Sequence, residues 1–410
     1  MKHRLGRSRT RRSGLVLGLV VGVAAVIVGA GAMQGDTEPQ PSRSVRAVAP
    51  VVPPSIAPPS TAPPSIAPPS TAPPRCTQES AIAQLPIRRR LAQLLIVGVD
   101  ARGPREALAA VTSEQVGGIF LTGSATGLLS GGALKQVQAA AELPVAVAVD
   151  DEGGRVQRID ELDGQLLSAR SMAAKLSPER VYELAVQRGR QLRARGVTVD
   201  FAPSVDVSGQ PDGAVIGDRS FSRDPSTVAR YAGAFAKGLR DAGVLPVFKH
   251  FPGHGRATGD SHRGAVSTPP LSALHEVDLL PYRRLLAGQS GAVMVGHLDV
   301  PGLTEPDTPA SISPAALVLL RDQLGFDGLV VTDDLGAMAA ITDRVDLASA
   351  VRQALAAGVD MALWVTKNRL GDVLDHLEQA VAGGSLPETR VNEAVAHVLA
   401  AKAVDICSGS

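Results

Sequence analysis

Short apolar runs recur along the chain after about residue 76, and amphipathic stretches lie between them. The runs are nearly continuous in Val, Ile, Leu and Ala, which is typical of strands that are covered on both faces. There are eight, at residues 94–100, 116–123, 144–150, 197–207, 244–251, 292–300, 329–334 and 360–365. Eight strands joined by helices predict an α/β fold, a single (β/α)8 TIM barrel. An open doubly wound sheet is the alternative, although no Gly-x-Gly-x-x-Gly motif follows an early strand.

Three of the stretches between the runs open with a polar residue followed by proline. The polar residues are Ser177, Asp224 and Ser313. Such side chains cap helix N-termini, and proline fits the first helical position because its missing N–H would be unpaired there anyway. We therefore expect helices to begin at residues 178, 225 and 314.

The first 75 residues have a different pattern. A basic start is followed by an uncharged apolar run at 14–33, which is long enough to cross a bilayer. The small residues 30–32 suit signal-peptide cleavage. Residues 1–33 are therefore expected to be a signal peptide or a membrane anchor. Residues 34–75 contain Pro-Ser-Ile-Ala-Pro-Pro-Ser-Thr-Ala-Pro twice, which predicts a disordered, extended Pro-rich linker.

This organisation predicts an exported protein whose folded domain, residues 76–410, is either held at the membrane or released to the cell wall. The chain has only two cysteines, Cys76 and Cys407, near the two ends of that domain. Exported proteins keep disulfides, and the termini of a domain often lie close together. We therefore expect an intramolecular Cys76–Cys407 disulfide.

Composition narrows the class of partner. The formal net charge is +1, and aromatic residues make up only 3% of the chain. Neither an overall positive field nor a set of stacking rings is available, so nucleic acid is not an expected partner.

Polar residues stand where five of the eight runs end. They are Asp150, Asp206, Lys249 with His250, His297, and Asp333 with Asp334. The C-terminal ends of the strands meet at one mouth of a TIM barrel, where the active site of such enzymes lies. Acids, bases and cations from five strand ends predict a convergent active site.

The segment 249–262 is the richest in chemistry, with three histidines, a lysine and an aspartate among glycines. One interpretation is a metal site formed by His250, His254, Asp260 and His262. The Gly-rich loop and the spacing would preorganise such ligands poorly, so no metal is expected. The other interpretation is glycosidic bond cleavage by a carboxylate nucleophile and a separate proton donor. Asp260 and His262 lie two apart, so in extended backbone the carboxylate can polarise the imidazole.

Three motifs together resemble the β-N-acetylglucosaminidases of glycoside hydrolase family 3. They are Lys249-His-Phe-Pro-Gly-His-Gly with Asp260-Ser-His262, Asp150-Asp-Glu-Gly-Gly-Arg-Val-Gln-Arg158, and Gly325-Phe-Asp-Gly-Leu-Val-Val-Thr-Asp-Asp334. The resemblance covers about residues 85–400. It implies a (β/α)8 barrel with no cofactor, similar to the single-domain members because the chain is too short for the second domain of many relatives.

The resemblance also implies roles for individual residues. Asp333 corresponds to the nucleophile and His262 to the general acid/base, with Asp260 as its partner. The residues that correspond to those holding the terminal sugar are Asp150, Arg158, Arg219, Lys249 and His250. The implied activity is that of a retaining exo-β-N-acetylglucosaminidase acting on peptidoglycan-derived fragments.

Several interpretations stay open at this stage. A phosphorylase, a β-glucosidase and a wall-binding protein without activity are the alternatives to a hydrolase of N-acetylglucosamine (GlcNAc). Locally, Asp334 is expected to cap the following helix, and Glu152 to form an ion pair with Arg155. Gly253 and Gly255 are interpreted as a hinge for the loop that carries His262.

Overall fold

The computed structural model describes residues 76–288, 291–366 and 369–407. The predicted export segment at 1–33 and the predicted linker at 34–75 lie outside these residues. Within them, no helix combines the length and the apolar character that crossing a membrane requires.

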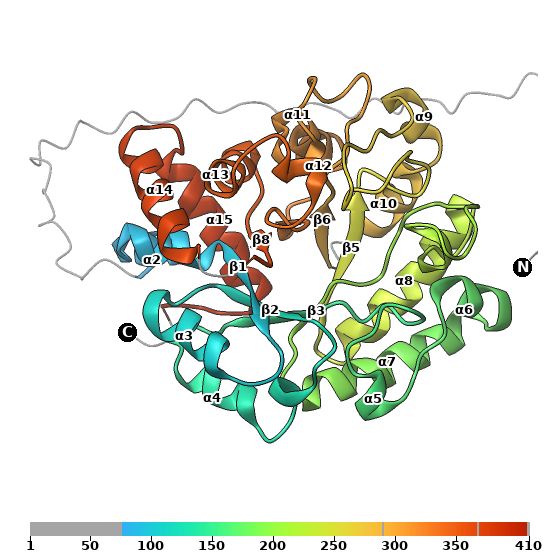
Figure 1. The fold of residues 1–410 in the computed structure, drawn as a ribbon, viewed down its shortest axis with the longest axis horizontal. Coiled ribbons are helices and arrows are strands. Elements are labelled where there is room, and N and C mark those ends of the chain that lie inside the picture. Colours follow the sequence, from blue (N-terminus) through green and yellow to red (C-terminus); the bar gives the residue numbers. More distant parts are fainter. Residues whose placement is uncertain (1–75, 289–290, 367–368, 408–410) are drawn as a thin grey trace, which may run out of the picture. The chain divides into compact units, whose positions relative to one another are not determined.

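Eight parallel strands form the centre of the folded domain, surrounded by helices (Figure 1). They are β1 (Leu95–Asp100), β2 (Gly118–Thr122), β3 (Ala146–Val149), β4 (Val199–Asp200), β5 (Leu245–Phe251), β6 (Ala292–Val295), β7 (Val330–Thr332) and β8 (Ala362–Trp364). Their hydrogen-bonded order is β7-β6-β5-β4-β3-β2-β1-β8. A parallel bridge between Val331 and Met361 joins the two ends of this order. The predicted (β/α)8 barrel is confirmed, and the open doubly wound sheet is wrong.

Each predicted run contains one strand, but several strands end earlier than the apolar pattern does. The fourth run was expected over 197–207, whereas β4 has only two residues. Residues 201–207, which follow β4, are buried and irregular apart from a parallel bridge between Ser204 and Lys249. Burial of this backbone explains why its composition resembles that of a strand, because apolar composition reports burial rather than hydrogen-bond pattern.

Helices cover the outside of the barrel. Their bounds are α1 (Gln78–Gln84), α2 (Ile87–Gln93), α3 (Arg105–Glu114), α4 (Ala133–Ala139), α5 (Asp160–Asp163), α6 (Ala169–Lys175), α7 (Pro178–Ala194), α8 (Pro225–Asp241), α9 (Leu271–Glu276), α10 (Leu279–Leu286), α11 (Pro314–Val318), α12 (Ala339–Thr342), α13 (Leu347–Ala357), α14 (Leu370–Ala382) and α15 (Glu388–Ala401). The three predicted helix starts are confirmed. Ser177 and Asp224 accept hydrogen bonds from backbone N–H groups of the first turn, whereas Ser313 makes no such bond.

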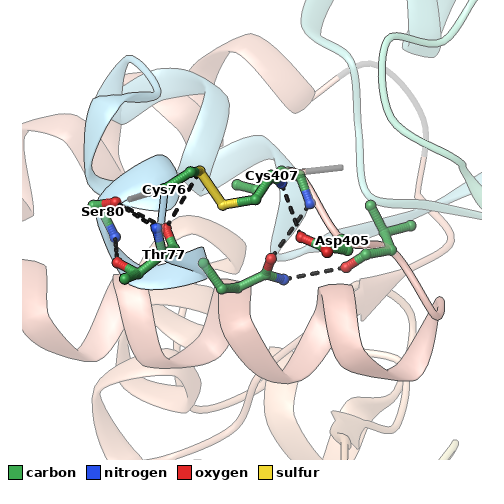
Figure 2. The surroundings of a disulfide bond; sticks show 8 residues. Cys76, Thr77, Ser80, Asp405 and Cys407 are labelled. Carbon is green, nitrogen blue, oxygen red and sulfur yellow. Dashed lines mark hydrogen bonds between the residues drawn. A yellow bond between two sulfur atoms is a disulfide. The ribbon is translucent and has the colours of Figure 1, made fainter. Parts of the chain in front are cut away.

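A disulfide joins Cys76 to Cys407, as predicted, across a sequence separation of 331 residues (Figure 2). Gln78 adds two hydrogen bonds beside it, because its side chain donates to the carbonyl of Val404 at 3.1 Å and accepts from the N–H of Ile406 at 3.3 Å. The segment after α15 is therefore fixed to the first helix of the domain.

Removing the disulfide is expected to lower the free energy of unfolding by about 2–4 kcal/mol, because the crosslink restricts a long loop of the unfolded chain. The Cys76→Ser/Cys407→Ser double variant should show this loss in chemical denaturation, and a reductant should produce a similar loss in the unmodified protein. The double variant itself should not respond to reductant. Equal stability of the two proteins under oxidising conditions would contradict the prediction.

Candidate active site

A cavity of about 270 Å³ opens at the C-terminal ends of the strands. Seven of the eight predicted site residues line it: Asp150, Arg158, Arg219, Lys249, His250, His262 and Asp333. A larger cavity of about 510 Å³ lies at the opposite mouth, where β5 begins and α15 ends, and no acid or histidine is among its lining residues. Acid/base and nucleophilic chemistry needs such groups, so the smaller cavity is the candidate active site.

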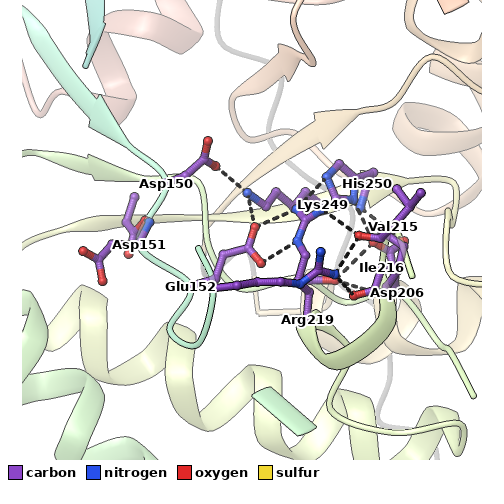
Figure 3. A network of polar contacts seen from close by, with 12 residues as sticks. Asp150, Asp151, Glu152, Asp206, Val215, Ile216, Arg219, Lys249 and His250 are labelled. Atoms are coloured by element: carbon purple, nitrogen blue, oxygen red, sulfur yellow. Dashed lines mark hydrogen bonds and ion pairs between the residues drawn. The ribbon is translucent and has the colours of Figure 1, made fainter. Parts of the chain in front are cut away.

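Lys249 is the centre of a buried network of charges (Figure 3). From the end of β5 its Nζ lies 2.5 Å from Asp150 Oδ1 and 2.6 Å from Glu152 Oε1. Arg219 donates through Nε and Nη2 to the two oxygens of Glu152, at 2.9 and 2.7 Å. Two acids and two cations thus alternate, and each fixes the direction of its neighbour.

Glu152 was not among the predicted site residues. Burial alone would raise its pKa, but Arg219 and Lys249 outweigh burial and hold the pKa well below its usual range. Glu152 therefore stays ionised and forms ion pairs with both Arg219 and Lys249, which fixes the positions of these two cations. The predicted ion pair with Arg155 is wrong, because Arg155 instead donates to Asp218 at 2.9 Å.

Arg158 has the loosest attachment of the predicted sugar-binding residues. Its Nη2 is 4.0 Å from Asp150 Oδ2, and its Nη1 donates to the carbonyl of Gln157 at 3.0 Å. Its backbone N–H donates to Asp151 Oδ2 at 3.0 Å, which anchors the turn rather than the guanidinium. The side chain is therefore available to a ligand at the cavity wall.

His250 forms a pair with buried Asp206, with 2.7 Å between Nδ1 and Oδ2. The other oxygen of Asp206 accepts the backbone N–H of His254 at 2.6 Å. Burial would raise the pKa of Asp206, but the charge and hydrogen bond of His250 overcome it and lower the pKa. An ionised Asp206 orients the imidazole so that Nε2 points toward Arg219 Nη2, 3.4 Å away.

Asp333 follows the last residue of β7 and lies in the cavity wall. Its Oδ1 accepts the N–H of Asp334 at 2.9 Å, and its own N–H donates to the carbonyl of Val295. Burial alone would raise its pKa, but the charges of His250 and Lys249 and the hydrogen bond from the N–H of Asp334 prevail and lower it. Asp333 is therefore a carboxylate at neutral pH, the form that a nucleophile requires.

Asp334 and His297 hold the backbone around Asp333. Asp334 Oδ1 accepts the N–H groups of Gly336 and Val365 at 2.9 and 3.0 Å, which ties the end of β7 to the end of β8. The expected helix cap is wrong, because α12 starts only at Ala339. His297 Nε2 lies 2.9 Å from the carbonyl oxygen of Asp334, and its Nδ1 lies 2.7 Å from Ser311 Oγ. Burial lowers the pKa of His297, so a neutral structural imidazole results.

His262 and Asp260 lie together on the loop after β5, as predicted. His262 Nδ1 is 3.2 Å from Asp260 Oδ1, which also accepts the backbone N–H of His262 at 3.0 Å. The carboxylate thus favours a proton on Nδ1 and leaves Nε2 for proton transfer. The His262 side chain is 63% exposed, in contrast to the buried groups on the strand ends.

Close packing is a reason for glycine at Gly253 and Gly255 that is separate from the predicted hinge, which stays a prediction. A Cβ atom on Gly253 would lie 2.6 Å from Asp278 Cβ, and one on Gly255 would lie 2.4 Å from the carbonyl oxygen of Val207. Both positions need glycine because neighbouring atoms approach too closely for a side chain. Substituting either residue would therefore cause a clash, and the exposed part of the loop begins only near Thr258.

The four groups of the metal interpretation do not converge. His250 pairs with Asp206, whereas His262 pairs with Asp260. In the described part of the chain, no group of three or more His, Cys, Asp or Glu residues is arranged to hold a metal ion.

A barrel with a buried carboxylate at the end of one strand, and an imidazole–carboxylate pair on another loop of the same mouth, can supply the nucleophile and the proton donor that a barrel glycosidase needs. Residues 86–401 match the family profile described as the glycosyl hydrolase family 3 N terminal domain. The chain therefore belongs to glycosyl hydrolase family 3.

Three relatives extend this comparison. The beta-hexosaminidase LpqI of Mycobacterium tuberculosis is 53% identical over 80% of this chain and 86% of its own length. A solved structure of a family 3 glycosyl hydrolase from Mycobacterium smegmatis is 53% identical, with a TM-score of 0.75 over 78% of this chain and 98% of that one. A family 3 beta-N-acetylglucosaminidase from Paenibacillus is 32% identical, with a TM-score of 0.74 over 78% of this chain and 62% of that one.

Proposed function

We propose that the protein is a retaining exo-β-N-acetylglucosaminidase that hydrolyses terminal β-linked GlcNAc. The observation that carries this proposal is that one cavity is lined by Asp333, ionised and buried, and by His262, whose Nδ1 contacts Asp260. The relatives named beta-hexosaminidase and beta-N-acetylglucosaminidase support the choice of sugar.

In the first step, Asp333 attacks the anomeric carbon and a covalent glycosyl-enzyme forms. His262 Nε2 gives its proton to the departing glycosidic oxygen, so the aglycone leaves as an alcohol. In the second step, water gives a proton to His262 and its oxygen displaces Asp333 from the sugar. Asp260, whose oxygen lies beside Nδ1, stabilises the imidazolium that forms in this step.

The buried network supplies the contacts for the terminal sugar. Asp150 accepts hydrogen bonds from hydroxyl groups, whereas Lys249, Arg219 and Arg158 donate them. A cavity of about 270 Å³ is small for a ligand site and suits one sugar ring rather than a run of several. This size supports removal of single terminal residues.

The natural substrate in this proposal is a peptidoglycan-derived fragment outside the cytoplasm. The basic and apolar sequence at 1–33 supports export, by a cleaved signal or as an anchor, and the Pro-rich linker at 34–75 would let the domain reach into a wall polymer. The Cys76–Cys407 disulfide also supports an oxidising compartment. The folded catalytic domain in this proposal extends from 76 to 410.

Hydrolysis of aryl glycosides tests the proposed function. We expect kcat/KM on the GlcNAc glycoside to exceed that on the glucose glycoside by about 100-fold or more, because a site built to hydrogen-bond a polar group of its substrate rejects an analogue that lacks this group. A preference for glucose would indicate a β-glucosidase. GlcNAc 1-phosphate as the main product in phosphate buffer would indicate a phosphorylase, and fragment binding without turnover would indicate an inactive wall-binding protein.

A further inference from the structure

Asp299 and Arg344 form an ion pair at the rim of the barrel mouth. Arg344 Nη1 and Nη2 donate to Asp299 Oδ1 and Oδ2, both at 2.6 Å. The side chains are 28% and 14% exposed, and neither residue lines the active-site cavity. A two-pronged pair of this kind fixes direction as well as distance, which a single contact does not.

The backbone of Asp299 forms hydrogen bonds with the base of the loop that holds His262. Its N–H donates to the carbonyl of Val266 at 2.8 Å, and its carbonyl accepts the N–H of Thr268 at 2.9 Å. Thr258 pairs in turn with Ser267, which closes residues 258–267 into a hairpin. The Asp260–His262 pair lies in this hairpin, so its position follows that of Asp299.

Arg344 belongs to the segment that follows Asp333. Between the two lies α12, where the N–H of Ala340 donates to the carbonyl of Ser261 at 3.0 Å. Ser261 immediately precedes His262. The segment after Asp333 therefore reaches the His262 hairpin at two points, directly at Ser261 and through the Arg344–Asp299 pair at the base.

The hairpin tip has little other support. His262 is 63% exposed and Arg263 is 87% exposed, and a Cβ on Gly264 would meet no atom within 4 Å. Double displacement requires the proton donor to stay at a working distance from the nucleophile. Here the two groups come from different loops, so contacts between these loops must set that distance.

We propose that Asp299 and Arg344 are positioning residues that keep His262 at its working distance from Asp333. This inference rests on the proposed function for the roles of His262 and Asp333. The ion pair itself touches neither group and acts by joining the backbone that follows the nucleophile to the hairpin that carries the acid/base.

The test compares two leaving groups in Arg344→Gln and Asp299→Asn variants. For an alkyl GlcNAc glycoside, whose departing oxygen needs the proton from His262, kcat/KM should fall about 10- to 100-fold. For a dinitrophenyl GlcNAc glycoside, whose leaving group needs no proton, it should fall by less than about 3-fold. The loss in kcat/KM for the double variant should be no larger than for either single variant, because all three variants break the same interaction.

Arg195→Gln is the matched control. Arg195 pairs with Asp163 at 2.5 Å with similar exposure, 22% and 19%, but at the C-terminal end of α7. Any change in kcat/KM that Arg195→Gln causes should be the same for the alkyl and the dinitrophenyl glycoside. Equal losses on both substrates in Arg344→Gln, or no loss on either, would overturn the proposal.

A second measurement does not depend on activity. Hydrogen exchange of residues 258–267, or trypsin cleavage after Arg263, should be roughly 10-fold faster in Arg344→Gln than in the unmodified chain or in Arg195→Gln. Unchanged protection would refute the positioning role whatever the kinetics. If the unmodified chain hydrolyses no GlcNAc glycoside, the proposed function fails, and the protection experiment still decides whether the ion pair holds the hairpin.

Discussion

The Asp333→Ala variant is expected to lose about four or more orders of magnitude in kcat on a GlcNAc glycoside, because no covalent intermediate can form. Asp333 is kept ionised by the charges of His250 and Lys249, and it is fixed by the N–H of Asp334. Loss of its side chain removes the nucleophile without breaking the buried network around Lys249. The measurement is steady-state hydrolysis, together with mass mapping of the adduct that a fluoro-sugar inactivator leaves on the unmodified enzyme.

Asp334→Asn provides the matched control for this substitution. An asparagine oxygen can still accept the N–H groups of Gly336 and Val365, so kcat should stay within about 10-fold of the original value. An adduct on a residue other than Asp333, or activity that survives Asp333→Ala, would show that the nucleophile is misassigned.

The His262→Ala variant is expected to lose about 10²- to 10⁴-fold in kcat/KM on an alkyl GlcNAc glycoside, the usual contribution of a positioned general acid. On a dinitrophenyl glycoside the loss should be small, because this leaving group departs without a proton. Asp260→Ala should show the same pattern with smaller losses, since Asp260 acts by orienting the imidazole.

His275→Ala serves as the control for the loss of a histidine. His275 lies on α9 beside Arg283, away from the cavity lining, and its removal should leave both substrates unaffected. A loss in His262→Ala that is the same for both leaving groups would mean that His262 binds or shapes the site rather than transferring the proton.

The barrel and the convergence of its polar strand ends could be predicted from the sequence because both follow from short-range signals. Buried parallel strands produce apolar runs, and any residue just past such a run must lie at the same mouth. Asp150, Lys249 and Asp333 are far apart in sequence, yet this one rule places all three at the cavity. The Asp260–His262 contact follows equally well from a spacing of two residues.

Contacts between side chains from distant segments could not be predicted in this way. Glu152 meets Arg219 across 67 positions, whereas the nearer Arg155 pairs elsewhere. The need for glycine at Gly253 comes from Asp278, which reaches it from another segment. Such contacts depend on how packed loops meet, and nothing in the local pattern of either segment records its partner.

The disulfide makes the folded domain a closed covalent ring, because Cys76 and Cys407 lie near its two ends, with Cα atoms 5.7 Å apart. A protease that cuts the exposed hairpin after Arg263 opens this ring without dividing the molecule, and the two pieces stay linked through sulfur. In an environment with extracellular proteases, a single cut would release no fragment until the disulfide is reduced. The nicked enzyme would therefore remain one molecule, and its two pieces would separate on a gel only after addition of a reductant.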